Sequence, residues 1–175
     1  MDYLDEVGEI AEQLADIGFE PVLVGGMALV ILGSRRITRD FDFVVARPED
    51  RVESLLDVFY GRGLELVSRL SEDGEAVSTI GSRKVAAVRL QLDAPSSVHF
   101  CNPSTGLRID LLFDFPLPAA TLARDATRIK VRSHVLLVAS EPDLLRLKRI
   151  AKAQRTSPGD AQDIAFLEAR RRRSG

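Results

Sequence analysis

The segment DFDFVV, residues 40–45, places two carboxylates in a run of apolar residues that favours a β-strand. Alternate side chains of a strand share one face, so Asp40 and Asp42 should point the same way while Phe41 and Phe43 point into a core. Two like charges on one face repel each other, and each resists losing water. A divalent cation between the two carboxylates would relieve both costs.

A third carboxylate has a similar setting later in the chain. Asp110 lies in the segment IDLLF, between Ile109 and Leu111, where a charge is costly unless it is paired or bound to a metal. If the two strands lie side by side, Asp40, Asp42 and Asp110 form an oxygen-only site suited to Mg²⁺ rather than zinc. The pattern alone leaves an alternative open, because Asp-x-Asp is also common at the exposed end of a strand.

Two glycines precede the acidic strand. Gly25 and Gly26 follow the apolar segment VLV and precede a segment of helical character. Glycines in this position let the backbone approach a phosphate closely, beside the free N–H groups of a helix N-terminus. The alternative is a tight strand-to-helix turn with no ligand.

Hydrophobic periodicity predicts an α/β (α+β) fold, in which a mixed sheet is flanked by helices. Helices are predicted over residues 4–17, 27–32 and 48–60, and strands over 21–24, 97–100 and 107–115. Residues 64–92 are rich in strand formers interrupted by SEDG and GSRK, which predicts a hairpin or meander. Asp114 is interpreted as a solvated strand end.

The character of the chain changes at PLPAA, residues 116–120. Beyond it, Ser140 with Asp143 and Ser157 with Asp160 have the spacing of helix caps. We therefore predict a core over residues 1–118 and a C-terminal helical segment over residues 119–175 that packs on it.

Charge is distributed unevenly along the chain. Residues 1–123 carry a net charge of -9 and residues 124–175 carry +7. This asymmetry favours phosphates, of a nucleotide or a nucleic acid, meeting the C-terminal part. A helical hairpin with solvated faces would explain the same pattern.

Composition narrows the setting further. There is no basic-then-apolar leader at the start and no apolar run of about 20 residues, so we expect a cytoplasmic protein without membrane contact. The single cysteine, Cys101, has no partner for an internal disulfide. Cys101, His99 and His134 are interpreted as structural.

The ordered set VGGMALVILGSRRITRDFDFVV and RIDLL resembles the DNA polymerase beta-like nucleotidyltransferase superfamily. Within it, RRITRDFDFVV and DLLRLKRIAKAQRTSPGDAQDIAFL are most similar to AbiEii-type abortive-infection nucleotidyltransferases of toxin–antitoxin systems. The resemblance implies an enzyme that moves a nucleotide from an NTP to an acceptor hydroxyl, with two Mg²⁺ ions on Asp40, Asp42 and Asp110.

The same resemblance assigns roles in the C-terminal segment. Lys148, Arg155, Asp160 and Asp163 fall on motif positions, and Lys148, Arg155 and Asp163 would join Gly25 and Gly26 in binding the nucleotide. From the residues alone, Asp160 is equally a capping partner, Asp163 a first-turn acid and Lys148 part of a solvated basic run.

The implied acceptor is an RNA end, of a tRNA for example, modified by a toxin with a cognate antitoxin protein as its partner. Two alternatives stay open. One is transfer to a small molecule such as an aminoglycoside, or to a protein. The other is a catalytically silent nucleotide-binding module.

Overall fold

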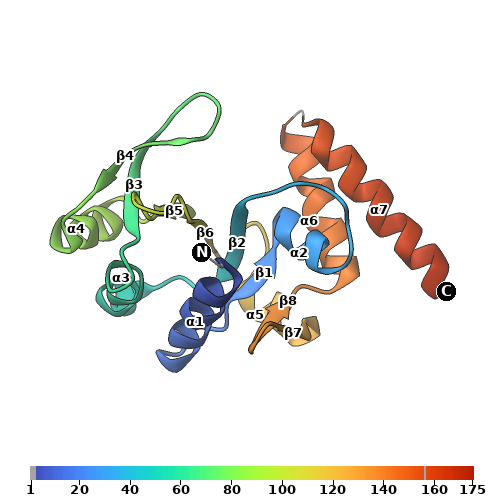
Figure 1. Ribbon diagram of the computed structural model, residues 1–175, viewed down its shortest axis with the longest axis horizontal. Helices are drawn as coiled ribbons and strands as arrows, with labels where there is room; N and C mark the ends of the chain where they lie inside the picture. Colours follow the sequence, from blue (N-terminus) through green and yellow to red (C-terminus); the bar gives the residue numbers. More distant parts are fainter. Residues whose placement is uncertain (1–2, 156) are drawn as a thin grey trace.

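A computed structural model describes residues 3–155 and 157–175 of the chain, in which eight strands form one mixed sheet (Figure 1). The order across the sheet is β4-β3-β5-β6-β2-β1-β8-β7. The strands are β1 (Val22–Val24), β2 (Asp40–Val45), β3 (Glu65–Leu70), β4 (Ala76–Ile80), β5 (Ser97–Cys101), β6 (Arg108–Phe113), β7 (Thr127–Val131) and β8 (His134–Val138). The prediction of a mixed sheet flanked by helices is confirmed.

The helices include two long ones at the C-terminal end, which lie side by side in Figure 1. They are α1 (Tyr3–Asp16), α2 (Gly25–Ile31), α3 (Val52–Tyr60) preceded by the 3-10 turn η1 (Glu49–Arg51), α4 (Arg83–Asp93), α5 (Ala119–Asp125), α6 (Glu141–Gln154) and α7 (Pro158–Ser174). None of the helices in the described part of the chain has both the length and the apolar character needed to cross a bilayer.

The middle of the sheet is fixed by strand β2. It runs parallel to β6 and antiparallel to β1, and its odd-numbered side chains, Phe41 and Phe43, are buried. On the far side of β6, β5 pairs antiparallel with it, and the rings of Phe100 on β5 and Phe59 on α3 stack with centroids 4.0 Å apart. This packing holds the acidic face of β2 opposite the core.

Helix α1 covers the sheet through the apolar stripe that its sequence predicts. Val7, Ile10 and Leu14 are fully buried at helical spacing. Gly8 lies on the same side and lets α1 approach β8 so closely that a side chain there would overlap His134.

The prediction of strands throughout residues 64–92 is wrong in its second half. β3 and β4 form the expected hairpin, but residues 83–93 form helix α4, whose N–H of Val85 is capped by the Ser82 hydroxyl. Ala86 and Leu90 are buried on one side of this helix. Tertiary burial of that side outweighs the strand preference of its valines.

The segment after residue 118 was expected to be helical, and it also contributes strands. β7 and β8 form an antiparallel hairpin, and β8 pairs parallel with β1 in the central sheet. The division into a core and a C-terminal segment stays a prediction. Helix α6 begins as predicted, with the Ser140 hydroxyl accepting a hydrogen bond from the N–H of Asp143.

Candidate functional site

The parallel pairing of β2 with β6 brings the predicted carboxylates together. Asp42 is directly opposite Asp110 in the register, and Asp40 is opposite Arg108. Because side chains alternate along a strand, Asp40, Asp42 and Asp110 share one face of the sheet.

Asp110 is a buried carboxylate with a histidine and an arginine as neighbours. Its Oδ1 lies 2.7 Å from Nδ1 of His99 on β5 and 3.0 Å from Nε of Arg108. Burial alone would raise the pKa of Asp110, but the hydrogen bonds from His99 and Arg108 hold that pKa below its usual value. Asp110 is therefore ionised at neutral pH.

Asp42 has the opposite electrostatic setting. Burial, the negative charge of Asp110 and a hydrogen bond to Asp110 raise the pKa of Asp42 to about 7, while Lys148 lowers it. Burial, with the nearby charge of Asp110, also raises the pKa of Asp40, which Arg108 opposes. The acidic face thus carries more negative charge than its surroundings compensate.

The carboxylates are close but are not arranged as a finished coordination shell. Within residues 3–155 and 157–175, no three His, Cys, Asp or Glu side chains stand in positions that would already hold a metal ion. One reason is visible in the geometry, because His99 and Arg108 engage Oδ1 of Asp110.

The turn between β1 and α2 passes directly over this acidic face. Gly25 has a φ of +70°, and a Cβ at this position would overlap the Asp42 carboxylate. Gly26 is less confined, because a Cβ there would lie 2.9 Å from Cζ of Arg36, the movable end of a long side chain. Only glycine combines this backbone conformation with such a close approach.

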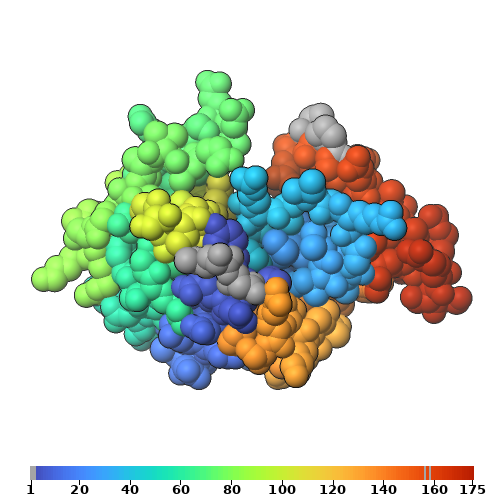
Figure 2. All heavy atoms as spheres, viewed as in Figure 1, coloured from blue at the N-terminus to red at the C-terminus, as the bar shows by residue number. Residues whose placement is uncertain are grey.

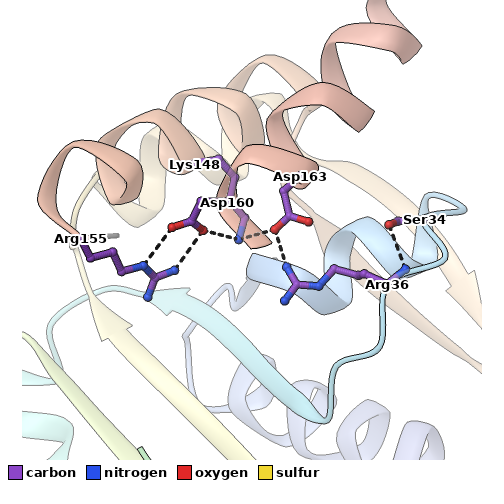
Figure 3. A network of polar contacts seen from close by, with 6 residues as sticks. All are labelled: Ser34, Arg36, Lys148, Arg155, Asp160 and Asp163. Atoms are coloured by element: carbon purple, nitrogen blue, oxygen red, sulfur yellow. Dashed lines mark hydrogen bonds and ion pairs between the residues drawn. The ribbon is translucent and has the colours of Figure 1, made fainter. Parts of the chain in front are cut away.

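A network of buried charges joins α6 to α7 (Figure 3). Asp160 and Asp163 on α7 are each 2% exposed. The Nζ of Lys148 on α6 lies 2.9 Å from Oδ2 of Asp163 and 3.6 Å from Oδ1 of Asp160. Lys148 is itself buried, so it is not part of the solvated basic run.

Two arginines complete the network. Arg155 donates from Nε and Nη2 to the two oxygens of Asp160, at 3.1 and 3.2 Å, and Arg36 donates to Asp163. Although burial opposes ionisation, the Arg155 hydrogen bonds hold the pKa of Asp160 below its usual value. The interpretation of Asp160 as a capping partner is wrong, since Ser157 makes no side-chain cap.

A pocket of about 270 Å³ lies between the sheet and α6. Its lining includes Gly25, Asp42, Lys148 and Arg155, which come from three elements, α2, β2 and α6 with its C-terminal cap. A single cavity therefore exposes an acidic side chain beside two cations, an arrangement that suits a metal-bound polyphosphate.

Four of the eight residues predicted for the site line this pocket, while Asp40 and Asp110 share the acidic face with Asp42 without lining it. The assignment of their roles stays a prediction. Asp163 contacts the lining residue Lys148, whereas Gly26 lies against Arg36, which does not line the pocket. Sequence reasoning missed Arg36 and Arg108, and it assigned His99 a purely structural role. Alternation of side chains along strand β6 was the one available signal for Arg108, because residues 108 and 110 are two apart and share a face of the strand.

The fold occurs in solved nucleotidyltransferase structures. An antigenic nucleotidyltransferase-like protein from Paracoccidioides brasiliensis is similar with a TM-score of 0.59 and 16% identity, over 94% of this chain and 74% of its own. The lincomycin-bound lincosamide adenylyltransferase LnuA gives 0.58 and 12% identity, over 94% and 95%. The chain has a nucleotidyltransferase fold.

A larger nucleotidyltransferase-fold structure also matches. The Megavirus polyadenylate synthase has a TM-score of 0.51 and 12% identity, over 94% of this chain and 30% of that one. No protein-family model matches the sequence, and no curated protein matches it in sequence.

Proposed function

We propose that this chain is a magnesium-dependent nucleotidyltransferase that moves a nucleotide from an NTP to an acceptor hydroxyl. The observation that carries this proposal is the juxtaposition of Asp42 and Asp110 across β2 and β6, beside a pocket lined by Lys148 and Arg155. Carboxylates for a metal and cations for a triphosphate are the two requirements of this chemistry.

The donor set fits Mg²⁺. Asp40, Asp42 and Asp110 offer only carboxylate oxygens, which Mg²⁺ prefers. Burial and the charge of Asp110 raise the pKa of Asp42 to about 7, and a divalent cation would relieve this unfavourable crowding of charge. We propose that the three aspartates hold two Mg²⁺ ions. When bound, these ions would polarise the phosphate oxygens and acidify the acceptor hydroxyl.

The protein's own residues would orient the triphosphate. Lys148 and Arg155 line the pocket from α6 and its C-terminal cap, and Gly25 adds no side chain to that lining. We propose that the triphosphate lies between Gly25 and these two cations. Asp163 would hold both Lys148 and Arg36 in place, and Gly26 would leave room for the Arg36 guanidinium beside the nucleotide.

The transfer is a single displacement at phosphorus. The acceptor oxygen forms a bond to the α-phosphorus, the bond to the bridging oxygen of the β-phosphate breaks, and pyrophosphate leaves with that electron pair. Asp110, which His99 and Arg108 keep ionised, would accept the proton of the acceptor hydroxyl.

We propose an RNA end, such as that of a tRNA, as the acceptor. Exposed cations follow one side of α6, at Arg146, Arg149 and Lys152, and continue at the end of α7. In Figure 2 the outline is hollowed between the β3–β4 hairpin, in green, and the α6–α7 pair, in orange and red. These cations would attract a polyanion such as RNA.

A small-molecule acceptor is the second candidate. It is favoured by the match to the lincosamide adenylyltransferase, because that likeness extends over 95% of the drug-modifying enzyme. Similarity of RRITRDFDFVV to AbiEii-type enzymes supports the RNA acceptor instead, and with it a growth-inhibiting toxin neutralised by a cognate antitoxin protein.

One experiment tests both the reaction and the acceptor. Purified protein is incubated with Mg²⁺, each α-labelled NTP, and either total RNA or a panel of lincosamide and aminoglycoside antibiotics. We expect label in RNA, released pyrophosphate and no label with Asp42→Asn. Absence of pyrophosphate with every acceptor would contradict nucleotidyl transfer, and label in an antibiotic alone would contradict the RNA acceptor.

A further inference from the structure

The pocket between the sheet and α6 has a lining of mixed character. Asp42, Lys148 and Arg155 are charged, while other lining residues are apolar, among them Leu112, Leu144 and Ile150. A nucleoside triphosphate combines the same two features, a charged phosphate chain and a flat base.

Strand β6 shows how far the apolar part lies from the carboxylates. Leu112 follows Asp110 by two residues on the same face, which places it about 7 Å further along the strand. Phe115 and Pro116 follow the end of β6 and also line the pocket. In this segment, the residues after Asp110 that line the pocket are all apolar.

Phe115 stands out among these lining residues. It is the single aromatic side chain of the pocket lining among the described residues, and it is 41% exposed. The other large exposed hydrophobic side chains in the described part of the chain, such as Ile37 and Leu92, lie outside this lining. An aromatic ring that no other ring covers is available for stacking.

The turn that carries Phe115 is held in place by the preceding residue. Asp114 has a φ of +50°, its N–H donates to the carbonyl of Val45, and its two carboxylate oxygens accept the N–H groups of Ala119 and Arg47 at 2.9 and 3.2 Å. Asp114 is thus more than a solvated strand end. A ring on such a turn is positioned before any ligand binds.

We propose that Phe115 is the platform on which the base of the substrate NTP stacks. This inference rests on the proposed nucleotidyl transfer, and it adds the subsite for the base. Gln154 is the one neutral hydrogen-bonding side chain that lines the pocket among the described residues. With so few groups to read a base edge, the subsite accepts all four bases, because every base has a face that can stack.

The absence of tryptophan from the sequence gives a direct test. In Phe115→Trp the new indole is the only one in the protein, and a base stacked on it changes its emission. Leu92→Trp, on the exposed side of α4, is the matched control. Each variant is titrated with non-hydrolysable analogues of ATP, CTP, GTP and UTP, and with inorganic tripolyphosphate, in the presence of Mg²⁺.

We expect the four analogues to quench Phe115→Trp emission with affinities within about tenfold of one another. Tripolyphosphate should compete with them without quenching, and Leu92→Trp should not respond. Calorimetry should show that Phe115→Ala weakens NTP binding about tenfold and leaves tripolyphosphate binding unchanged.

Two results would overturn the proposal, and they are distinguishable. If the unaltered protein binds the NTP analogues but Phe115→Trp emission and Phe115→Ala affinity do not change, the base lies elsewhere while nucleotidyl transfer stands. If the unaltered protein binds no NTP analogue in calorimetry, both the base subsite and the proposed function fail.

Discussion

Lys148 and Asp163 form an ion pair of 2.9 Å between α6 and α7, and both side chains are buried. The lysine that lines the pocket is therefore held in position by a neighbouring helix before a ligand enters. A long flexible side chain loses much of its rotamer freedom on binding, so this pairing lowers the entropy that a triphosphate would have to overcome.

Lys148→Met should lower both stability and NTP affinity. The substitution leaves Asp160 and Asp163 with Arg155 and Arg36 as their remaining partners, and we expect a loss of about 2 kcal/mol in the free energy of unfolding. Urea denaturation measures the loss. Lys152→Met, an exposed lysine on the same helix, should change stability little, and equal effects from both variants would contradict the role of the buried pair.

Asp42→Asn should abolish transfer and stabilise the metal-free fold. Replacing one carboxylate of a repelling pair should lower the rate at least about a hundredfold. Because the folded protein raises the pKa of Asp42 to about 7, the ionised carboxylate destabilises the fold at neutral pH. Its removal should add about 1 kcal/mol to the free energy of unfolding without Mg²⁺.

The control for this variant is Asp73→Asn, which changes an exposed carboxylate in the β3–β4 turn. It should keep full activity and unchanged stability. Normal turnover by Asp42→Asn would contradict the assignment of the acidic face.

Gly25→Ala should impair the site far more than Gly33→Ala. Both glycines have a positive φ, so both substitutions strain the backbone by about 1 kcal/mol. Only at Gly25 does the added Cβ meet the Asp42 carboxylate, whereas nothing lies within 4 Å of a Cβ at Gly33. Transfer assays and thermal unfolding of the two variants separate the effect of backbone strain from that of overlap with Asp42. Equal losses of activity in both variants would contradict the importance of the contact between Gly25 and Asp42.

His134 should make stability depend on pH. A hydrogen bond that the His134 ring donates to Glu12, aided by the charges of Asp5 and Glu9, raises the pKa of His134 above its usual 6.5. A raised folded pKa means that the stabilisation is complete below about pH 6.5 and is lost as the pH rises through the folded value. His134→Gln should therefore reduce the difference in urea midpoint between pH 6 and pH 8.5.

Glu12→Gln tests the same contact from its partner and should flatten the profile in the same way. A profile that neither substitution changes would show that other groups set the pH dependence.

Local patterns in the sequence predicted much of the fold. Alternation in DFDFVV defined β2, and the spacing of Ser140 and Asp143 defined the start of α6, because both depend on near neighbours. Helix α4 was missed because Val85 and Val88 favour strands, and only packing of Ala86 and Leu90 decides for a helix.

The sequence predicted those features of the site that depend on the side chains of one strand. The shared face of Asp40 and Asp42 follows from alternation, but the register that sets Asp42 against Asp110 depends on pairing of distant strands. The same limit explains why His99 and Arg36 were missed. Each reaches its carboxylate across the fold, and no local pattern marks such partners.

Strands β1 and β8 are parallel neighbours, and just past the end of β8 the N–H of Ala139 donates a 3.1 Å hydrogen bond to the carbonyl of Leu23 in β1. Each runs directly into a helix that borders the pocket, β1 into α2 and β8 into α6. The register between these two strands therefore sets how far apart α2 and α6 lie on either side of the pocket. A slip of one residue in the pairing of β8 with β1 would displace α6 by about 3.3 Å. A change in the β7–β8 hairpin that causes this slip would therefore alter which ligands fit, without touching any residue that binds them.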